Sequence, residues 1–525
     1  MPMPASSDLM DMPIAGWGDP AKRKGLPPEA VGWLAGRVGR GATSTPVDLG
    51  AVAVPASRLS AGDLAALGEI CETRTDDAMR ALHAAGRSYQ DLVRLRGGAF
   101  PAPDAVLLPA DADEVARLLV ACAGLGVAVV PFGGGTSVVG GVAPLAGAFR
   151  AVVALDLRRL DRLVSVSSDD LTAVLEPGLR GPAAEALLNE QGFTLGHFPQ
   201  SYECASIGGY AATRSAGQAS TGNGRFDANV LGLALQTPAG PLVLGRGAAT
   251  AAGPGLLQLM VGSEGAFGVI TSVTMRIKPL PAVKKYDAYL VRSWADGIAQ
   301  LRALEQSGVV PTVARLSDLE ETAVSMQLSA PRPVKRLARD RCLMVLGWEG
   351  SAASVRSRRR AASIKGIRLP GAGDTWEHGR YSGPYLRDDL MDNGFLVETL
   401  ETSAPWSHLL TVHAEVRAAL TAALGRCVVM CHVSHLYPQG ASLYFTAFAG
   451  AADDPVSQWQ VAKEAACDAL VRTGATITHH HAVGADHRRW MTDEIGPLGV
   501  DVLRAVKERL DPTGILNPGK LIPEE

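Results

Sequence analysis

The sequence predicts an α+β protein with two main units. Between residues 101 and 280, short β-branched runs alternate with helical segments, and a second set of strands and helices follows between residues 281 and 450. Three Gly-rich segments lie within residues 131–271 of the first unit. Strands and helices mixed along the chain in this way are typical of an α+β fold.

The composition is that of a folded globular protein without a strong charge bias. The chain has 525 residues, 47% of them hydrophobic and 20% charged, which excludes a disordered or fibrous protein. Its 50 basic and 53 acidic residues leave a net charge of −3. This balance gives no reason to expect a nucleic acid as a partner.

Cysteine usage and the N-terminal residues predict a cytoplasmic protein. The seven cysteines form no CxxC pair, so we expect a reducing compartment and no disulfide framework. The spacing of Cys427 and Cys431 beside His432 and His435 fits zinc templates poorly, and no metal site is predicted. Residues 1–13 have neither the basic nor the apolar region of a secretory signal.

One long charge-free run could be mistaken for a membrane span. It extends from Leu118 to Phe149 and is long enough to cross a bilayer. Its glycine triplet and its two prolines argue against a continuous helix. We therefore expect a helix, a strand and a Gly-rich loop in this run.

The N-terminal region and the first unit have these expected elements. Residues 1–100 are expected to pack on the core, with helices over Pro28–Val38 and Ala61–Ala85. In the unit 101–280, Asp111 or Asp113 is a candidate N-cap for a helix. The expected strands are Pro103–Leu108, Val127–Pro131, Val152–Leu155 and Thr172–Leu175, and the expected helices are Glu114–Gly124 and Gly181–Gln191.

The second unit, 281–450, and the C-terminal segment, 451–525, continue the pattern. The expected strands are Tyr286–Val291, Thr312–Leu316, Arg341–Gly347, Cys427–Tyr437, Ala441–Phe448 and Thr476–Thr478. The expected helices are Ala295–Ser307, Ala352–Ile364, Leu409–Leu424, Val456–Arg472 and Val500–Leu510. Gly371–Asp374 reads as a turn, and Pro438–Gly440 as the connection of a hairpin.

The strongest local motif is the run Val129–Ser137, in which a strand leads into three glycines and two hydroxyls. Glycines let the backbone approach a phosphate, and successive N–H groups can form an anion-binding nest. The run is neither a Walker A loop nor a Rossmann fingerprint. With the further segments Ser206–Gly217 and Gly262–Thr271, it indicates one extended nucleotide wrapped in backbone.

These segments together resemble the FAD-binding domain of the vanillyl-alcohol-oxidase/p-cresol-methylhydroxylase flavoprotein superfamily. The resemblance implies a two-subdomain FAD-binding domain, completed by the C-terminal segment, and an α+β substrate or cap domain. Because the first Gly loop contains no His, non-covalent FAD is expected. The cofactor-binding residues implied are Pro131, Phe132, Gly133, Gly134, Gly135, Thr136, Ser137, Gln200, Ser201, Ser206, Gly208, Gly209, Thr213, Arg214, Ser215, Ala216, Glu264, Gly265, Gly268, Val269 and Ile270.

The second half of the chain narrows the resemblance. Tyr385–Asp388, Glu398–Trp406, Ala441–Phe445 and Thr478–Gly484, with Trp17-Gly18 near the start, resemble the alkyldihydroxyacetonephosphate synthase family. That family makes the ether bond of ether lipids. The activity implied is exchange of the acyl group of 1-acyl-dihydroxyacetone phosphate for a long-chain alcohol, with no net redox change.

The resemblance also implies catalytic residues. Tyr444 would be the acid/base, while Arg387 and Arg315 would contact the charged groups of the substrate. His480 and His481 would bind phosphate and relay protons. The residues themselves favour parts of this assignment: strand alternation puts Ser442, Tyr444 and Thr446 on one face, and an unpaired charge at Arg315 would be costly in its apolar strand.

Some residues depart from the synthase pattern. The ending Asn517–Leu521 is typical of D-2-hydroxyacid dehydrogenases and oxidases, His432 stands where an Arg is expected, and Thr446 replaces an aromatic residue. The alternatives are therefore an FAD-dependent D-2-hydroxyacid or alcohol dehydrogenase or oxidase, and a non-catalytic FAD-binding or lipid-carrier protein. The hairpin around Ser434–Gly440 lacks the metal-site signature of some hydroxyacid enzymes.

The expected partners follow from the implied reaction. They are an amphiphilic small-molecule substrate pair, acyl-dihydroxyacetone phosphate and a fatty alcohol, with peripheral contact at the inner membrane face. A homodimer is the expected assembly.

Overall fold

The computed structural model of the chain describes residues 12–46, 52–98, 100–329 and 332–524. Residues 1–11, on which the expectation of no secretory signal depends, lie outside the described residues. Among the helices that are described, none combines the length and the apolar character needed to cross a membrane.

The first unit contains a four-stranded sheet in the described part of the chain, in the order β1-β2-β4-β3. Its parallel strands β3 and β4 are almost wholly buried. Asp111 is the N-cap of the covering helix, because its carboxylate accepts from the amides of Asp113 and Glu114. The elements are α2 (Ala61–Gly68), β1 (Glu72–Arg74), α3 (Asp77–Leu82), β2 (Ala105–Leu108), α5 (Ala112–Leu125), β3 (Val127–Phe132) and β4 (Ala151–Asp156).

A five-stranded antiparallel sheet lies beside it, in the order β5-β6-β10-β8-β9 among the described residues. Its core includes Phe226, Phe267 and Tyr210. The elements are β5 (Leu163–Ser167), β6 (Thr172–Leu175), α6 (Gly181–Asn189), β7 (Phe193–Thr194), α7 (Ile207–Thr213), α8 (Ser220–Asn223), α9 (Phe226–Asn229), β8 (Val230–Thr237), β9 (Gly240–Leu244), α10 (Leu256–Met260), β10 (Val269–Arg276) and β11 (Lys278–Pro279).

The second unit is built on a sheet whose described strands have the order β15-β12-β14-β13-β17-β18-β16. The strands are β12 (Val283–Val291), β13 (Val313–Ser317), β14 (Cys342–Gly350), β15 (Ile367–Arg368), β16 (Phe395–Pro405), β17 (Cys427–Tyr437) and β18 (Gly440–Gly450). The helices around it are α1 (Pro28–Val38), α4 (Tyr89–Arg96), α11 (Trp294–Gln306), α12 (Leu319–Ser329), α13 (Arg332–Ala338), α14 (Ala352–Ala361), α15 (Ala372–Gly379), α16 (Gly383–Asp392), α17 (Leu409–Leu424) and α18 (Pro455–Arg472).

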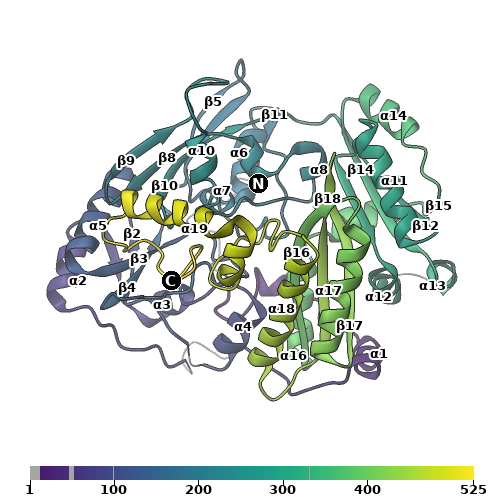
Figure 1. Cartoon of the computed structure of the whole chain (residues 1–525), viewed down its shortest axis with the longest axis horizontal. Helices are drawn as coiled ribbons and strands as arrows, with labels where there is room; N and C mark the ends of the chain where they lie inside the picture. Colours follow the sequence, from purple (N-terminus) through teal and green to yellow (C-terminus); the bar gives the residue numbers. More distant parts are fainter. Residues whose placement is uncertain (1–11, 47–51, 99, 330–331, 525) are drawn as a thin grey trace.

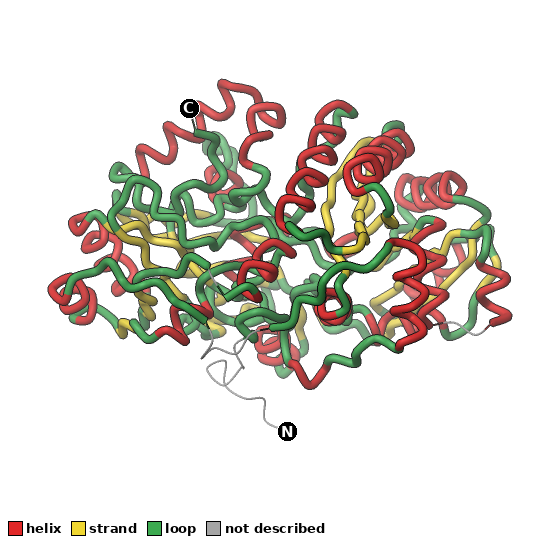
Figure 2. The backbone as a smooth tube through the Cα atoms, turned by 90° about the horizontal axis from the view of Figure 1, so that it is seen from below, coloured by secondary structure: helices red, strands yellow, loops and turns green. Residues whose placement is uncertain are grey.

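The C-terminal segment returns from the second unit to the first. Figure 1 shows α19 (Met491–Leu510) lying across the first unit, after α18 has packed beside α17 on the large sheet. The chain then pairs with β3: the Val129 amide donates to the Ile515 carbonyl over 2.8 Å, and the Asn517 amide donates to the Val129 carbonyl over 2.8 Å. Loops and turns occupy much of the middle of the molecule, between the strands of its two ends (Figure 2).

Four expected elements differ in the structure. The prediction of a single helix over Ala61–Ala85 is wrong, because Ser60 and Asp76 cap two separate helices on either side of β1. The strand expected at Thr476–Thr478 does not form; its Ile477 amide donates to the Glu494 carboxylate instead of to a ladder.

The two remaining differences concern helices. The last helix begins at Met491, earlier than expected, with a kink at Gly496 before Pro497. The turn expected at Gly371–Asp374 is the start of α15, with Gly371 in a left-handed conformation as its N-cap.

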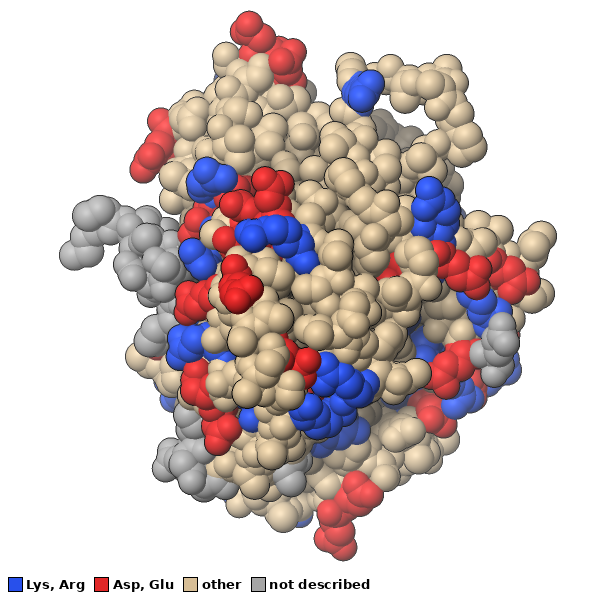
Figure 3. Space-filling model, turned by 90° about the vertical axis from the view of Figure 1, so that its left-hand side faces the viewer, with Lys and Arg blue, Asp and Glu red and all other residues tan. Residues whose placement is uncertain are grey.

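The surface agrees with a chain of balanced charge. On the face shown in Figure 3, basic and acidic side chains are interspersed and separated by broad uncharged areas. This face therefore shows no broad area of a single charge sign.

Replacing Asn517 by Ala should destabilise the fold. Its side-chain amide donates to the carbonyls of Gly141 (3.1 Å) and Glu264 (2.7 Å), and its backbone has a positive φ of 42°. Losing two buried hydrogen bonds at a left-handed residue should lower the free energy of unfolding by about 2–4 kcal/mol. Denaturant unfolding measures this, with exposed Asn189→Ala as the control; a change below about 0.5 kcal/mol would contradict the prediction.

Candidate active site

A cavity of about 520 Å³ lies where the Gly-rich segments face the large sheet. Its walls come from the loop after β3, from α7 and the loop before β10, and from β13, α16, β16, β17 and β18. The C-terminal residues His480 and His481 complete the lining. Segments far apart in the sequence therefore converge on one site.

The Gly-rich segments pack so closely against neighbouring protein atoms that a side chain would collide with them. A Cβ atom at Gly133 would lie 2.3 Å from the Ser206 hydroxyl, and one at Gly134 would lie 2.3 Å from the Cys204 carbonyl. Gly135 and Gly265 have positive φ values of 65° and 76°. The backbone is thus exposed to the cavity in the manner that suits a phosphate-bearing ligand.

All of the predicted cofactor-binding residues line this cavity except Arg214 and Val269. Arg214 turns away because its guanidinium donates to the carbonyls of Val261 and Gln258. Val269 is fully buried in the core behind the cavity. Those two residues hold the second and third segments in place and do not face the ligand space.

Glu264 ties the third Gly-rich segment to the loop that carries the His run. Its carboxylate accepts from the amides of Val483 (2.9 Å) and Gly484 (2.8 Å). Burial raises the pKa of Glu264 to about 7, against the opposing effect of these hydrogen bonds.

Tyr444 projects from β18 into the cavity, as the strand alternation predicts. Its hydroxyl donates to Thr399 Oγ1 over 3.1 Å, and its ring stacks on His432 with centroids 4.9 Å apart. Burial raises the pKa of Tyr444 to about 12, while the Thr399 hydrogen bond and Arg387 oppose that shift. The resting side chain is therefore a neutral phenol.

Arg387 brings donors that lack partners to the cavity. It lies on α16, with its side chain 11% exposed, and Nη1 donates to the Arg87 carbonyl. Among the described residues, its buried Nε and Nη2 have no hydrogen-bond acceptor, although Asp388 Oδ1 lies 3.7 Å from Nε. Arg387 lines the cavity, and buried guanidinium donors without an acceptor favour an anionic ligand nearby.

Arg315 also lines the cavity, but its charge is already paired. It donates to the buried carboxylate of Glu321 and to His432 Nε2 (3.1 Å). The other imidazole nitrogen of His432 lies 2.9 Å from Glu321 and donates to it, since Nε2 accepts from Arg315. Although burial opposes ionisation, Arg315 and His432 lower the pKa of Glu321 to about 2. Arg315 is thus a less available anion site than Arg387.

The His run is folded into the site by one buried carboxylate. Glu401 on β16 accepts from the Thr478 hydroxyl (2.6 Å) and from the backbone amides of His479, His480 (3.1 Å) and His481 (2.7 Å). Burial opposes its ionisation, but the three imidazoles nearby and Thr478 lower the pKa of Glu401 well below its ordinary value. The loop therefore depends on an ionised Glu401.

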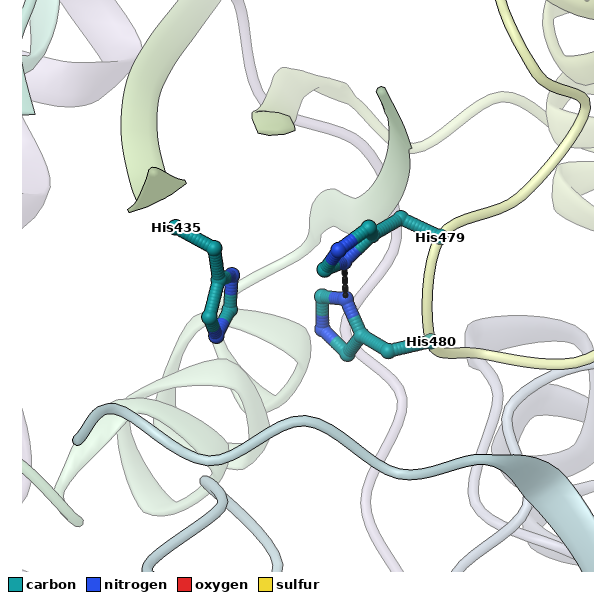
Figure 4. Close-up of side chains that lie close together, drawn as sticks. All are labelled: His435, His479 and His480. Atoms are coloured by element: carbon teal, nitrogen blue, oxygen red, sulfur yellow. Dashed lines mark hydrogen bonds between the residues drawn. The ribbon is translucent and has the colours of Figure 1, made fainter. Parts of the chain in front are cut away.

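Figure 4 shows three imidazoles facing one another: His435 from β17 and His479 and His480 from the loop. Their candidate ligand atoms lie within 4.8 Å of one another, close enough to hold a metal ion. Protein partners already engage both nitrogens of two of them. His435 bonds to Ser434, Ser442 and the Gly217 carbonyl, and His479 bonds to Tyr437 and His480. The contacts favour a hydrogen-bonded network.

Sequence reasoning did not identify three residues that shape the site. Glu401 and Thr399 lay inside the quoted Glu398–Trp406 motif without a role, and Glu321 was not singled out. A Glu two residues after a Thr in an apolar strand is a weak signal, because its function depends on a loop 77 residues later in the chain.

The comparisons with known proteins agree with this geometry. Residues 103–244 match the family described as "FAD binding domain", and residues 280–521 match "FAD linked oxidases, C-terminal domain". A solved 4-ethylphenol oxidase from Gulosibacter chungangensis has the same fold, with a TM-score of 0.69 at 15% identity over 90% of this chain and 98% of that one. The chain is a flavoprotein of the vanillyl-alcohol-oxidase fold, and FAD is its cofactor.

The family follows from two further relatives. The chain is 32% identical over 484 residues to the alkyldihydroxyacetonephosphate synthase of Dictyostelium discoideum, covering 86% of this chain and 79% of the relative. A solved alkyldihydroxyacetonephosphate synthase superposes with a TM-score of 0.82 at 27% identity, covering 97% of this chain and 99% of that chain. The chain belongs to the alkyldihydroxyacetonephosphate synthase family.

The cavity fits FAD on its own geometry. The glycine cradle leaves room for a pyrophosphate against bare backbone, and hydrogen-bonding atoms of Tyr210 and Gln218 are buried without a partner among the described residues. Both residues line the cavity.

Replacing Gly134 by Ala should prevent FAD retention. The added methyl group would meet the Cys204 carbonyl at 2.3 Å and the Ala205 Cα at 2.7 Å, so the backbone of the first Gly-rich loop or of its neighbours must move. We expect purified protein with less than about a tenth of the wild-type flavin absorbance per chain, since one lost factor of ten in affinity is about 1.4 kcal/mol. Gly36→Ala, where the same atom meets nothing within 4 Å, should retain full absorbance; a yellow Gly134→Ala protein would contradict the prediction.

The free energy of unfolding should fall as the pH drops below 6.5. Burial lowers the pKa of His435 and His480 to about 3 and that of His481 to about 4, from an ordinary 6.5. The unfolded chain binds protons there that the folded chain does not, so each imidazole contributes a slope of up to about 1.4 kcal/mol per pH unit between pH 6.5 and 4.

Denaturant unfolding of the FAD-bound protein across this range measures that slope. His480→Gln should reduce it by about one proton. The matched control is His378→Gln, at a side chain that is 81% exposed. A stability that is flat or rises on acidification would show that these imidazoles are not buried in their neutral form.

Proposed function

We propose that the chain exchanges the acyl group of 1-acyl-dihydroxyacetone phosphate for a long-chain alcohol, giving the 1-alkyl ether and a fatty acid. One observation carries this proposal. Arg387, the Tyr444 phenol and the His run line the same cavity as the FAD cradle, and two buried Arg387 donors have no acceptor among the described residues. Membership of the synthase family supports the substrate class.

An apolar arm of the cavity supports an amphiphilic substrate. On the side of the large sheet, part of the lining is apolar and consists of aliphatic, thioether and aromatic side chains: Leu34, Val324, Leu390, Val397, Met430 and Phe448. Burying a hydrocarbon chain along such a surface is favourable by about 0.8 kcal/mol per methylene. The arm would take the acyl chain and then the alkyl chain, and Arg387 lies beside it for the phosphate or the leaving carboxylate.

Each side chain has a defined task in the exchange. Tyr444 is the acid/base: as the phenolate it takes the proton from C1 of the substrate, and as the phenol it returns that proton to C1 once the alcohol oxygen has bonded there. Burial raises the pKa of Tyr444, and the charge of Arg387 opposes that rise. Arg387 also binds the anionic group of the substrate. FAD, when bound, supplies a ring that can accept an electron pair from the substrate. Arg315 bonds to Glu321 and to His432, whose ring stacks on Tyr444.

The exchange is balanced without an oxidant. The C1–O bond to the acyl group breaks and the carboxylate leaves with the electron pair, while the alcohol oxygen forms the new bond to C1. The alcohol loses its hydroxyl proton, so one proton is released in each turnover at neutral pH, where a fatty acid is ionised.

The ending that resembles hydroxyacid enzymes has a structural task here. Asn517 joins two Gly-rich segments, and the Lys520 ammonium donates to the Ala143 and Pro518 carbonyls. Those contacts hold the cradle and reach no substrate group, so the ending does not favour redox chemistry over exchange.

Finer features belong to the same proposal. FAD is bound non-covalently, because the first Gly-rich loop carries no His, and acid precipitation should release it. Amphiphilic substrates favour peripheral contact of a cytoplasmic protein with a membrane, and a homodimer is the assembly we propose.

The function is tested by anaerobic flavin absorbance with a substrate panel. Acyl-dihydroxyacetone phosphate should perturb the flavin spectrum, and a long-chain alcohol should restore it with release of fatty acid. Persistent reduction by a D-2-hydroxyacid or an alcohol would instead identify a redox enzyme. Tyr444→Phe should lower the exchange rate at least about 100-fold while FAD stays bound, because loss of a positioned acid/base group costs about 10²–10⁴.

The control is Tyr286→Phe. Tyr286 lies on β12 outside the cavity lining, and the substitution removes a hydroxyl that bonds to Glu349 over 2.8 Å. It should exchange at the wild-type rate. A Tyr444→Phe enzyme within about tenfold of wild type would exclude Tyr444 as the acid/base.

A further inference from the structure

The proposed exchange releases a proton that must leave the buried cavity. One proton is released per turnover into a cavity whose reacting groups, Tyr444, His480 and His481, are at least half-buried. If that proton stayed on a buried side chain, the next turnover would start from the wrong protonation state. A route to solvent is therefore required, and this inference depends on the proposed function.

We propose that His480, His479 and Tyr437 form a proton-exit relay, which leads from the cavity to the Tyr437 hydroxyl beside the partly exposed Arg225–Asp227 pair. His480 lines the cavity, His479 lies behind it, and Tyr437 ends β17 at a partly exposed position.

Hydrogen bonds join the three groups without a gap. His480 Nδ1 and His479 Nδ1 are 2.9 Å apart, the contact drawn as a dashed line in Figure 4. His479 Nε2 lies 2.6 Å from the Tyr437 hydroxyl. Arg225 bonds to Tyr437 and pairs with Asp227, and their side chains are 21% and 14% exposed. The relay thus runs from a cavity wall to a position within reach of water.

Each member can take a proton on one side and release one on the other. An imidazole accepts at one nitrogen while it donates from the other, and a phenol oxygen accepts while its own proton leaves. For outward transfer, His480 donates from Nδ1 to His479 Nδ1, His479 donates from Nε2 to Tyr437, and Tyr437 releases its proton towards solvent. No member carries a lasting charge after the transfer.

Two other imidazoles at the cavity cannot serve as exits. His435 points Nε2 at the Gly217 carbonyl (2.9 Å), and a carbonyl oxygen cannot pass a proton onward. His432 lies between Arg315, which is always protonated, and Glu321, whose pKa is lowered to about 2. Both are fixed in one tautomer by groups that do not release a proton at neutral pH.

The charges around the relay favour transfer of the proton over its retention on an imidazole. Burial lowers the pKa of His480 to about 3, and His481, Arg225 and His432 oppose its protonation further, while Glu401, 3.5 Å from Nδ1, favours it. Around His479, burial, His435, His480 and Arg225 act against the charged form and Glu401 for it. A proton therefore crosses these imidazoles without resting on them.

Tyr437→Phe tests the relay, because it removes one hydroxyl and keeps the ring. With saturating substrates and weak buffer, kcat should fall about 10-fold or more with KM unchanged, since a positioned proton-transfer group contributes about 10² or more. A pH-indicator dye should show proton release lagging behind fatty-acid release. Small buffers such as imidazole should restore kcat. His479→Gln, which breaks the middle of the relay, should reproduce the lag.

The controls separate the relay from folding and from the proposed function. Flavin absorbance and melting temperature check that both variants are folded, and Tyr286→Phe should show synchronous release of proton and fatty acid. A Tyr437→Phe enzyme within about twofold of wild type, or a slower one that shows no lag and no rescue by buffer, overturns the relay alone. Tightly bound stoichiometric metal in the wild type overturns it too, because a ligated imidazole cannot pass a proton. A wild type that performs no exchange contradicts the proposed function itself.

Discussion

The site depends on the buried carboxylate of Glu401. From strand β16 it accepts hydrogen bonds from three successive backbone amides and from the Thr478 hydroxyl, and so bends the His run into the cavity. A buried charge is tolerated only when it is fully bonded, and these four donors satisfy it. Glu264 binds the same loop in the same way, because its carboxylate accepts from the amides of Val483 and Gly484, about five residues further along the loop. One loop is thereby held to the large sheet and to the Gly-rich segments at the same time.

The two arginines of the cavity differ because their surroundings differ. The charge of Arg315 is paired with Glu321, and Arg315 also orients His432 against Tyr444. Its role is therefore to position these side chains. Arg387 lines the cavity and has two buried donors without an acceptor among the described residues, which suits an anionic substrate group. The imidazoles differ in the same way. His435 Nε2 bonds to a backbone carbonyl, which cannot pass a proton onward, whereas His479 and His480 bond to groups that can exchange protons.

The fold class, several helices and strands such as β3, β17 and β18 could be predicted from local patterns. Strands β5, β8, β9 and β10 of the five-stranded sheet and β16 of the large sheet, which carries Glu401, were not predicted. The Asp111 cap, the hairpin of β17 and β18 and the orientation of Tyr444 all follow from neighbouring residues. The expectations that failed, a single helix over Ala61–Ala85 and a strand at Thr476–Thr478, were decided by side-chain caps and by the distant Glu494 carboxylate. The chemistry of the cradle was visible early, since only glycines permit such close backbone contacts.

By itself the sequence determined which segments are glycine-rich, which strand presents Tyr444 and which charge stands alone in an apolar strand, because these properties depend on residues a few positions apart. Tertiary structure alone decided that Glu401 binds a loop 77 residues later, that Arg315 is neutralised by Glu321, and that Tyr437 contacts His479 42 residues away. Such contacts carry no local signal, since hydrogen bonds and ion pairs form between whichever groups the packing of the sheets brings together.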